Sequence, residues 1–195
     1  MTVSFNMRKS IFLPALLLLL PLISQAQISP TCFNEVYCAP NVASGTGSGS
    51  QGDPANFFDA LDYAQSNPNL ILKLDTGTYI VDGSTLLNTA PLNIPSDVII
   101  QGGFAQAGGW VQTTQGSSLI RITNAAANQQ TNPSRIVGFS GISVNNFKLK
   151  DLRIICDDLD PASNGSGATS YGVYLNGCSD YDVLRCEITA GSATD

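Results

Sequence analysis

The sequence predicts an all-β fold whose short strands stack as successive coils of a solenoid. Three observations predict it. After Asn69, short apolar runs alternate with Gly, Asn, Ser and Asp, which is the pattern of strands joined by turns. Segment 147–154 is repeated by segment 181–188, at an offset of 34 along the chain. Charged residues at matching positions of these segments have opposite signs, as expected for parallel strands about 4.8 Å apart.

Residues 1–26 have the features of a secretory signal peptide. Arg8 and Lys9 precede an apolar run at 11–23, and small residues follow at Ser24 and Ala26. A membrane span needs about 20 apolar residues, and two prolines interrupt this shorter run. We therefore expect cleavage after Ala26, a secreted, extracellular or cell-surface location, and no transmembrane span in the mature chain.

The charge balance excludes several functions. Without the signal peptide, 7 basic residues face 15 acidic ones, which gives a net charge of −8. Such a chain offers no basic patch for nucleic acid or an anionic membrane. The sequence has no histidine, so a Ser-His-Asp triad, a His-ligated zinc site and an imidazole general base are excluded within this chain.

Residues 27–52 are predicted as a linker that ends in the Gly/Ser-rich stretch GSGSQG, residues 47–52. This stretch matches the G-x-G-x-x-G fingerprint of dinucleotide sites. However, no buried strand precedes it, and Asp53 and Pro54 would begin the following helix, which places a carboxylate where a phosphate should lie. We therefore expect no nucleotide cofactor.

Five cysteines are present. In an exported protein, Cys32 and Cys38 enclose a short polar loop and are candidates for a disulfide. Cys156, Cys178 and Cys186 are predicted to be buried thiols that pack as small apolar residues.

Residues 53–195 are predicted to form one domain that begins with a helix at 54–66. Asp53 is the expected N-cap, and Asn67-Pro68 ends the helix. One apolar face is expected to cover the end of the coils, which begin at residue 69; it comprises Phe57, Phe58, Leu61 and Ala64. The predicted strands are 70–74, 78–81, 92–94, 98–101, 118–122, 135–139, 147–155, 173–175 and 181–188.

The self-comparison also predicts which residues stack. At the offset of 34, three core-type positions stay apolar: Leu149 with Val183, Leu152 with Cys186, and Ile154 with Ile188. Upstream, 140–146 aligns with 171–177 at an offset of 31, which pairs Gly141 with Gly172 and Asn145 with Asn176. Three extra residues near 178–180 would then form a turn.

The matching charged positions predict cross-strand ion pairs, which are Lys148 with Asp182, Asp151 with Arg185, and Arg153 with Glu187. Lys150 falls opposite Leu184 and has no partner in this register. Each exposed pair contributes only about 0–1 kcal/mol. The ion pairs are therefore useful mainly because they specify the register in which the strands pair.

The order of these segments resembles that in a known family. GTGSGSQGDPANFFDALDYAQ is followed by LILKLDTGTYIV and IPSDVIIQGGF, and YGVYLNGCSDYDVLRCEI lies near the C-terminus. These stretches resemble the beginning and a typical coil of bacterial secreted or surface proteins of the pectin-lyase-like superfamily. The resemblance covers about residues 45–190 and implies a right-handed parallel β-helix with a helix over its first coil.

The resemblance also implies a candidate calcium site. Uronate lyases of this superfamily hold Ca²⁺ with clustered carboxylates and use Arg or Lys as the base. The acidic cluster here is Asp157, Asp158 and Asp160, and oxygen ligands suit calcium. The alternative is a solvated turn. The candidate bases are Lys150, Arg153 and Arg185. The alternative for the basic residues is that they form ion pairs between stacked strands. Pectin hydrolase activity of this superfamily requires a histidine and is not expected in this chain.

Exposed aromatic residues are candidates for carbohydrate binding. Trp110 lies between glycine-rich turns, and Tyr174 lies with Tyr171 and Tyr181 on a predicted outer face. The alternative for Trp110 is that it packs with Phe104 over the first coils.

Three functions remain open. The leading hypothesis is a non-catalytic β-helix module of a secreted or cell-surface protein, such as an adhesin, that binds polysaccharide or a cell-surface glycan. The alternative is the N-terminal part of a calcium-dependent polysaccharide lyase; an inert spacer is the third. No cofactor other than Ca²⁺ is expected. Because nothing covers the last predicted strand, we expect this chain to be the first part of a longer protein.

Overall fold

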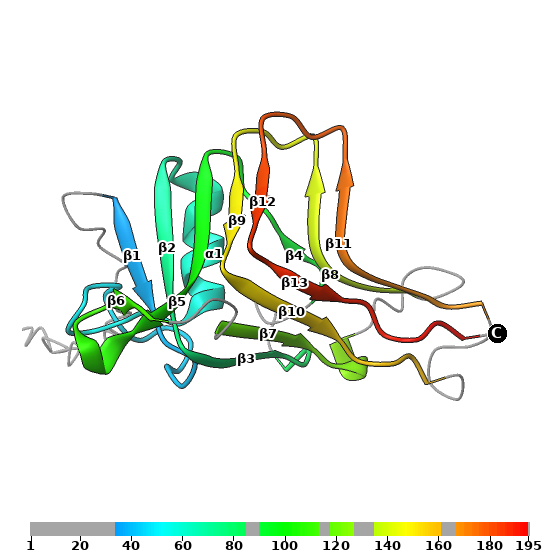
Figure 1. Ribbon diagram of the computed structural model, residues 1–195, viewed down its shortest axis with the longest axis horizontal. Helices are drawn as coiled ribbons and strands as arrows, with labels where there is room; N and C mark the ends of the chain where they lie inside the picture. Colours follow the sequence, from blue (N-terminus) through cyan, green and yellow to red (C-terminus); the bar gives the residue numbers. More distant parts are fainter. Residues whose placement is uncertain (1–33, 85–89, 114–117, 127–134, 161–166, 195) are drawn as a thin grey trace, which may run out of the picture.

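The computed structural model describes residues 34–84, 90–113, 118–126, 135–160 and 167–194 (Figure 1). The protein is mostly β, with a single α-helix among these residues, α1 (Phe57–Ser66). The strands are β1 (Glu35–Cys38), β2 (Leu70–Asp75), β3 (Gly77–Val81), β4 (Leu92–Asn93), β5 (Val98–Ala105), β6 (Val111–Gln112), β7 (Ser118–Ile122), β8 (Arg135–Ile142), β9 (Lys148–Lys150), β10 (Leu152–Cys156), β11 (Thr169–Asn176), β12 (Asp182–Leu184) and β13 (Glu187–Thr189). Two 3-10 turns are η1 (Gln106–Gly108) and η2 (Asn124–Ala126).

The strands form three sheets with parallel pairing. The first sheet has the order β1-β2-β5-β9-β12, the second β13-β10-β7-β3, and the third β11-β8-β4. The short strand β6 is antiparallel to β5. From β2 onward the chain visits the first, second and third sheets in turn, and it repeats this order up to β13 in the second sheet. Figure 1 shows β2, β5, β9 and β12 side by side as a result.

The register predicted for the last two repeats is confirmed. Lys148 pairs with Asp182 and Ile154 with Ile188, which is the predicted offset of 34. The same offset relates β7 to β10 and β8 to β11, since Ser118 pairs with Leu152 and Arg135 with Thr169.

The offset of 31 predicted for 140–146 is wrong. Gly141 pairs with Leu175, and Asn145 forms a bridge with Ser179, so the period of 34 continues without an insertion. Gly172 lies over Gly138 instead: a Cβ on Gly138 would lie only 2.4 Å from the carbonyl oxygen of Gly172. The similarity between the two Gly-apolar-x-apolar-Asn stretches is therefore a coincidence of composition.

Strand β1 lies inside the range predicted as a linker. It pairs in parallel with β2, and Val36 and Cys38 are fully buried. Its outer edge is also covered, because the Tyr37 amide donates to the Gly49 carbonyl and the Ala55 amide donates to the Tyr37 carbonyl. Parallel strand pairing therefore begins before residue 69.

The helix begins at Phe57 and not at Pro54. The Asn56 side chain is the N-cap and accepts hydrogen bonds from the backbone amides of Phe58 and Asp59, at 2.8 and 3.4 Å. The predicted cap, Asp53, instead accepts from the Ser48 amide at 2.9 Å. The start is delayed because the chain is still paired with β1 at Ala55.

The core lies between the sheets and the buried face of α1. Alternate residues of β2, β5, β7, β9 and β10 point inward and are buried, as the period of two along a strand requires. Helix α1 adds its own buried side chains to the same cluster, namely Phe57, Ala60, Leu61 and Ala64. Within the ranges given above, no helix is long and apolar enough to cross a membrane.

Substitutions at the same position of neighbouring paired strands should lower the free energy of unfolding by very different amounts. Ile154 is 0% exposed, whereas Ile188, its partner in the next strand, is 41% exposed. We expect Ile154→Ala to lower the free energy of unfolding by about 2–5 kcal/mol, and Ile188→Ala to cost much less because it creates no closed cavity. Urea denaturation measures both. Equal costs would contradict this packing.

The N-cap can be tested directly. Asn56→Ala should lower the free energy of unfolding by about 1 kcal/mol, because two amides of the first turn lose their acceptor. Asp53→Ala, the matched control, leaves those amides paired and should reduce the helical circular dichroism signal less. A larger loss for Asp53→Ala would place the cap where the sequence predicted it.

Candidate functional site

A shallow depression of about 390 Å³ lies where β7, β10 and β13 end. Its polar lining side chains are Arg121, Asp157, Asp158 and Thr189. Strand register explains how they meet, because Ile155 of β10 pairs with Arg121 of β7 on one side and with Thr189 of β13 on the other. Residues far apart in the sequence are thus neighbours on one sheet.

Arg121 and Asp157 form a two-point ion pair in this depression. Arg121 Nε lies 2.8 Å from Asp157 Oδ1, and Nη2 lies 3.0 Å from Oδ2. Asp157 is held in place because its amide donates to the carbonyl of Ile122, which continues the ladder beyond β10. The carboxylate raises the pKa of Arg121, first through the hydrogen bonds and then through its charge. The Arg121 side chain remains 51% exposed and so can contact a ligand.

Asp158 is fixed by the segment that follows β13. Its Oδ1 accepts a hydrogen bond from the Ser192 amide at 2.6 Å, and this bond lowers the pKa of the Asp158 carboxyl. The Leu159 amide donates to the Ser192 carbonyl in return. Gly191 allows the close approach, since a Cβ there would lie 2.1 Å from the Asp157 carbonyl oxygen.

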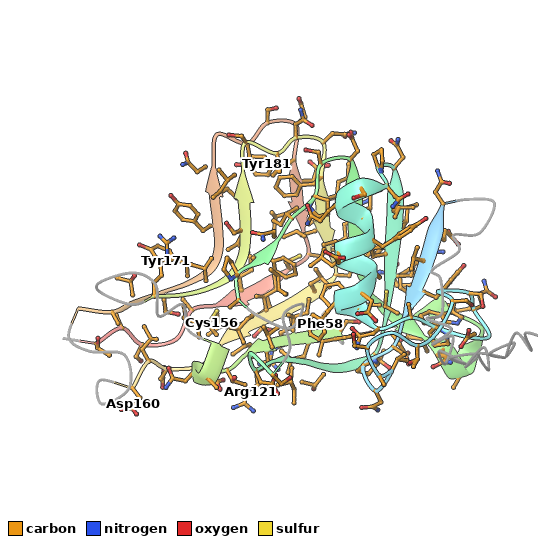
Figure 2. All side chains as sticks on the ribbon, turned by 180° about the vertical axis from the view of Figure 1, so that it is seen from behind. Phe58, Arg121, Cys156, Asp160, Tyr171 and Tyr181 are labelled. Atoms are coloured by element: carbon orange, nitrogen blue, oxygen red, sulfur yellow. The ribbon has the colours of Figure 1, made fainter. Side chains whose placement is uncertain are left out.

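The predicted acidic cluster does not gather into one group. Asp157 binds Arg121, while Asp158 binds a backbone amide. Figure 2 shows Asp160 at some distance from Arg121. Among the described residues, no set of three or more His, Cys, Asp or Glu side chains is placed to hold a metal ion. Calcium binding by Asp157, Asp158 and Asp160 stays a prediction.

The three predicted ion pairs are present. Lys148 Nζ lies 2.9 Å from Asp182 Oδ2, Arg185 Nε lies 2.6 Å from Asp151 Oδ1, and Arg153 Nε lies 3.2 Å from Glu187 Oε2. Arg153 Nε makes no hydrogen bond. Two of the candidate bases, Arg153 and Arg185, therefore face carboxylates on the neighbouring strand. The third, Lys150, pairs in register with Leu184 as predicted.

Asp151 is the centre of a buried polar network that the sequence shows only in part. Its side chain is 1% exposed and accepts from Arg185, from Gln112 at 2.6 Å and from Gln101 at 3.3 Å. The Arg185 hydrogen bond is the largest cause of the lowered Asp151 pKa, and burial opposes it. Both Asp151 and Arg185 have positive φ, at 55° and 51°, so they form the corner between the first and second sheets. This network is structural.

Trp110 is not an exposed aromatic ring on which a sugar could stack. It is 6% exposed and packs edge-to-face on Tyr37, with ring centroids 4.7 Å apart. Its Nε1 donates to the Gln51 carbonyl at 3.0 Å. The ring is buried because β6 folds back antiparallel on β5. Trp110 therefore fits the alternative prediction, in which it packs against the first strands and is not exposed.

Tyr174 belongs to an aromatic pair on β11. Its ring lies edge-to-face with that of Tyr171, at a centroid distance of 5.8 Å, and Tyr171 is exposed. Tyr181 instead stacks flat on Phe147. Tyr171 extends from the third sheet and Arg121 from the second, and Figure 2 shows them apart. Tyr174 and the depression at Arg121 are therefore separate candidates.

A second depression, of about 320 Å³, lies between the loop after β1 and strand β3. Phe58 and Ile80 supply apolar surface, and Asn41, Ser44 and Thr78 supply uncharged polar groups. The sequence gives no sign of it, because the loop was expected to be a linker.

Among the described residues, no cysteine is bonded to another. Cys38 and Cys156 are buried, and Cys178 and Cys186 are partly buried. Burial raises the pKa of Cys156 to about 11 and also raises that of Cys186. Cys32 lies outside the described residues, so its pairing with Cys38 stays a prediction.

Comparison with known proteins finds no matching family model, no similar curated protein and no similar solved structure. Fold and site together define a mostly β protein with parallel sheets and a polar depression at the strand ends. The chemistry of that depression is therefore derived from its own residues.

The buried Asp151 carboxylate should make stability depend on pH. Its folded pKa lies below the ordinary value of 3.8, so its contribution is fully present above about pH 4 and is lost as the pH falls through the folded pKa. We expect Asp151→Asn to cost about 1–3 kcal/mol at pH 7, and this cost should shrink by pH 2. Urea denaturation at both pH values measures it.

The matched control is Asp62→Asn, at an exposed position on α1. It should change stability little at either pH. A cost for Asp151→Asn that is the same at pH 7 and pH 2 would show that the carboxylate charge is not what the network stabilises.

Proposed function

We propose that the chain is a right-handed parallel β-helix of the pectin-lyase-like kind that serves as a secreted or cell-surface module for adhesion or glycan binding. The repeated visit to three sheets in one order, the parallel pairing and the constant offset of 34 in the later coils support the β-helix. Residues 1–26 lie outside the described part, so secretion rests on the sequence.

The depression at Arg121 is the observation that carries the glycan proposal. Sugar hydroxyls are recognised by side chains that donate or accept hydrogen bonds at fixed positions. Arg121 is a fixed donor, since Asp157 holds its guanidinium by two contacts. Asp158 is a fixed acceptor, since the Ser192 amide holds it. Thr189 adds a hydroxyl on the neighbouring strand.

The charges favour a neutral glycan. Asp157 compensates Arg121, so Asp158 leaves the depression with a net negative charge. The chain as a whole carries a net charge of −6, which repels acidic polysaccharides. A hydroxyl-rich, uncharged sugar matches both conditions.

The uronate lyase alternative has less support. A lyase base must be able to give up its proton, and Asp157 raises the pKa of Arg121, which is ordinarily far above neutral already. Arg153 and Arg185 also face carboxylates. A product that absorbs in the ultraviolet, formed from an acidic polysaccharide with added calcium, would overturn the non-catalytic proposal.

Binding to a panel of neutral glycans tests the proposal. Arg121→Ala should weaken binding about tenfold or more, because a charged hydrogen bond to the ligand is lost. Lys150→Ala is the matched control, since it removes the same charge from the first sheet, away from the depression. Equal affinities of the two variants, or no glycan bound at all, would count against this site.

A further inference from the structure

The depression between the loop after β1 and strand β3, which we call the β3 depression, has walls that are fixed by hydrogen bonds. The Asn56 side-chain amide donates to the Val42 carbonyl at 2.7 Å. The Ser44 hydroxyl and the Gly45 amide donate to the two carboxylate oxygens of Asp59, at 2.7 and 2.6 Å. Since Asn56 caps α1 and Asp59 lies in its first turn, the loop is attached to the helix. The β3 depression is therefore formed before any ligand binds.

The lining of the β3 depression matches an uncharged sugar. Ile80 is 47% exposed and Phe58 is half-buried, so both present apolar surface. Asn41, Ser44 and Thr78 add an amide and two hydroxyls, which can donate or accept hydrogen bonds. None of the described lining residues is charged, so a charged ligand would lose hydration without gaining an ion pair. A sugar presents both an apolar ring face and hydroxyl groups, which fits an aromatic ring beside polar side chains.

Strand register places the β3 depression next to the depression at Arg121. Ile80 of β3 pairs with Arg121 of β7, and Arg121 pairs with Ile155 of β10. The residues before and after each of these three are buried, so the three side chains point to the outer face of the second sheet. Ile80 lines the β3 depression, whereas Arg121 and Ile155 line the other one. Because paired strands lie about 4.8 Å apart, the two depressions adjoin on one face.

A peptide strand that pairs with β3 is a poorer match for this place, although β3 is the last strand at its end of the second sheet. Pro40 lies against the start of β3, since a Cβ on Gly77 would lie only 2.9 Å from Pro40 Cγ. The loop after β1 therefore lies beside β3, and both contribute to the lining of the depression. A strand pairing with β3 along its length would have to displace this loop.

We propose that the two depressions are subsites of one binding surface, and that the ligand is an extended neutral oligosaccharide that crosses β7 and β3. One sugar residue lies over Arg121, and the chain continues past Ile80 to the Phe58 ring in the β3 depression. This inference rests on the proposed function, because the depression at Arg121 is its glycan site. A single sugar reaches only one depression, whereas a chain held at Arg121 meets the second subsite at a high effective concentration.

Affinity should therefore increase with the length of the oligosaccharide. Isothermal titration calorimetry of the purified chain with cello-, xylo- and malto-oligosaccharides of one to six residues measures it. In the series that binds, affinity should rise about tenfold or more from the shortest to the longest member, because the second subsite adds apolar contact. The same affinity for every length would show that the ligand occupies only one depression, which overturns the proposal.

Ile80→Ser tests the second subsite. It removes apolar surface from the β3 depression and should lower the affinity for the longest oligosaccharide about tenfold. Ile142→Ser is the matched control and should change this affinity little, because Ile142 is 60% exposed on β8 in the third sheet. If Ile80→Ser fails to fold by circular dichroism, Asn41→Ala, at an exposed loop position of the β3 depression, should weaken binding in the same way and decides instead.

Arg121→Ala separates this inference from the proposed function. If Arg121→Ala weakens binding while Ile80→Ser and Asn41→Ala do not, the glycan site at Arg121 stands and the extended surface is wrong. If Ile80→Ser weakens binding and Arg121→Ala does not, the β3 depression binds the ligand alone, and the extended surface and the Arg121 site are both wrong. If no neutral oligosaccharide binds, the proposed function and this inference fail together.

Discussion

Parallel backbone pairing in a fixed register is the constraint on which the rest of the structure depends. Each strand takes its position from the strand one cycle earlier, so a side chain has the same column and the same face as its counterpart. Apolar residues at matching positions of successive strands form the core, and charged residues at matching positions form the ion pairs. The depression at Arg121 has the same origin, since Arg121 and Thr189 lie on either side of Ile155 only because both pair with it.

Register was predictable where charge and hydrophobicity repeated together. The Lys148–Asp182 and Arg153–Glu187 pairs could be predicted because residues of opposite charge recur at one offset along the sequence. The offset of 31 failed because it relied on a Gly-apolar-Asn likeness without charges to fix it. The helix start and β1 were missed for a different reason. Both depend on the pairing of β1 with Ala55 and with β2, which no local pattern in the sequence records.

The candidate site was predictable only in fragments. Asp157 and Asp158 stood out as neighbouring acids, but Arg121, which binds Asp157, lies on an earlier strand and has no local signal. For Trp110 the sequence left exposure and burial open, because burial of an aromatic ring near glycines depends on the chain folding back at β6. In these parallel sheets, strands that pair are far apart in the sequence, so residues that act together can be identified only when the register is known.

The contact between Gly138 and Gly172 has a consequence for how this chain tolerates change. A methyl group on Gly138 would strike the Gly172 backbone, and one on Gly172 would lie 2.4 Å from a side-chain carbon of Ile188. The space available, and not the chemical character of the side chain, therefore decides which residues fit at these two positions. In a saturation mutagenesis library, Gly138 would therefore tolerate no larger residue, because its neighbour is backbone, whereas a larger residue at Gly172 would have to displace the Ile188 side chain.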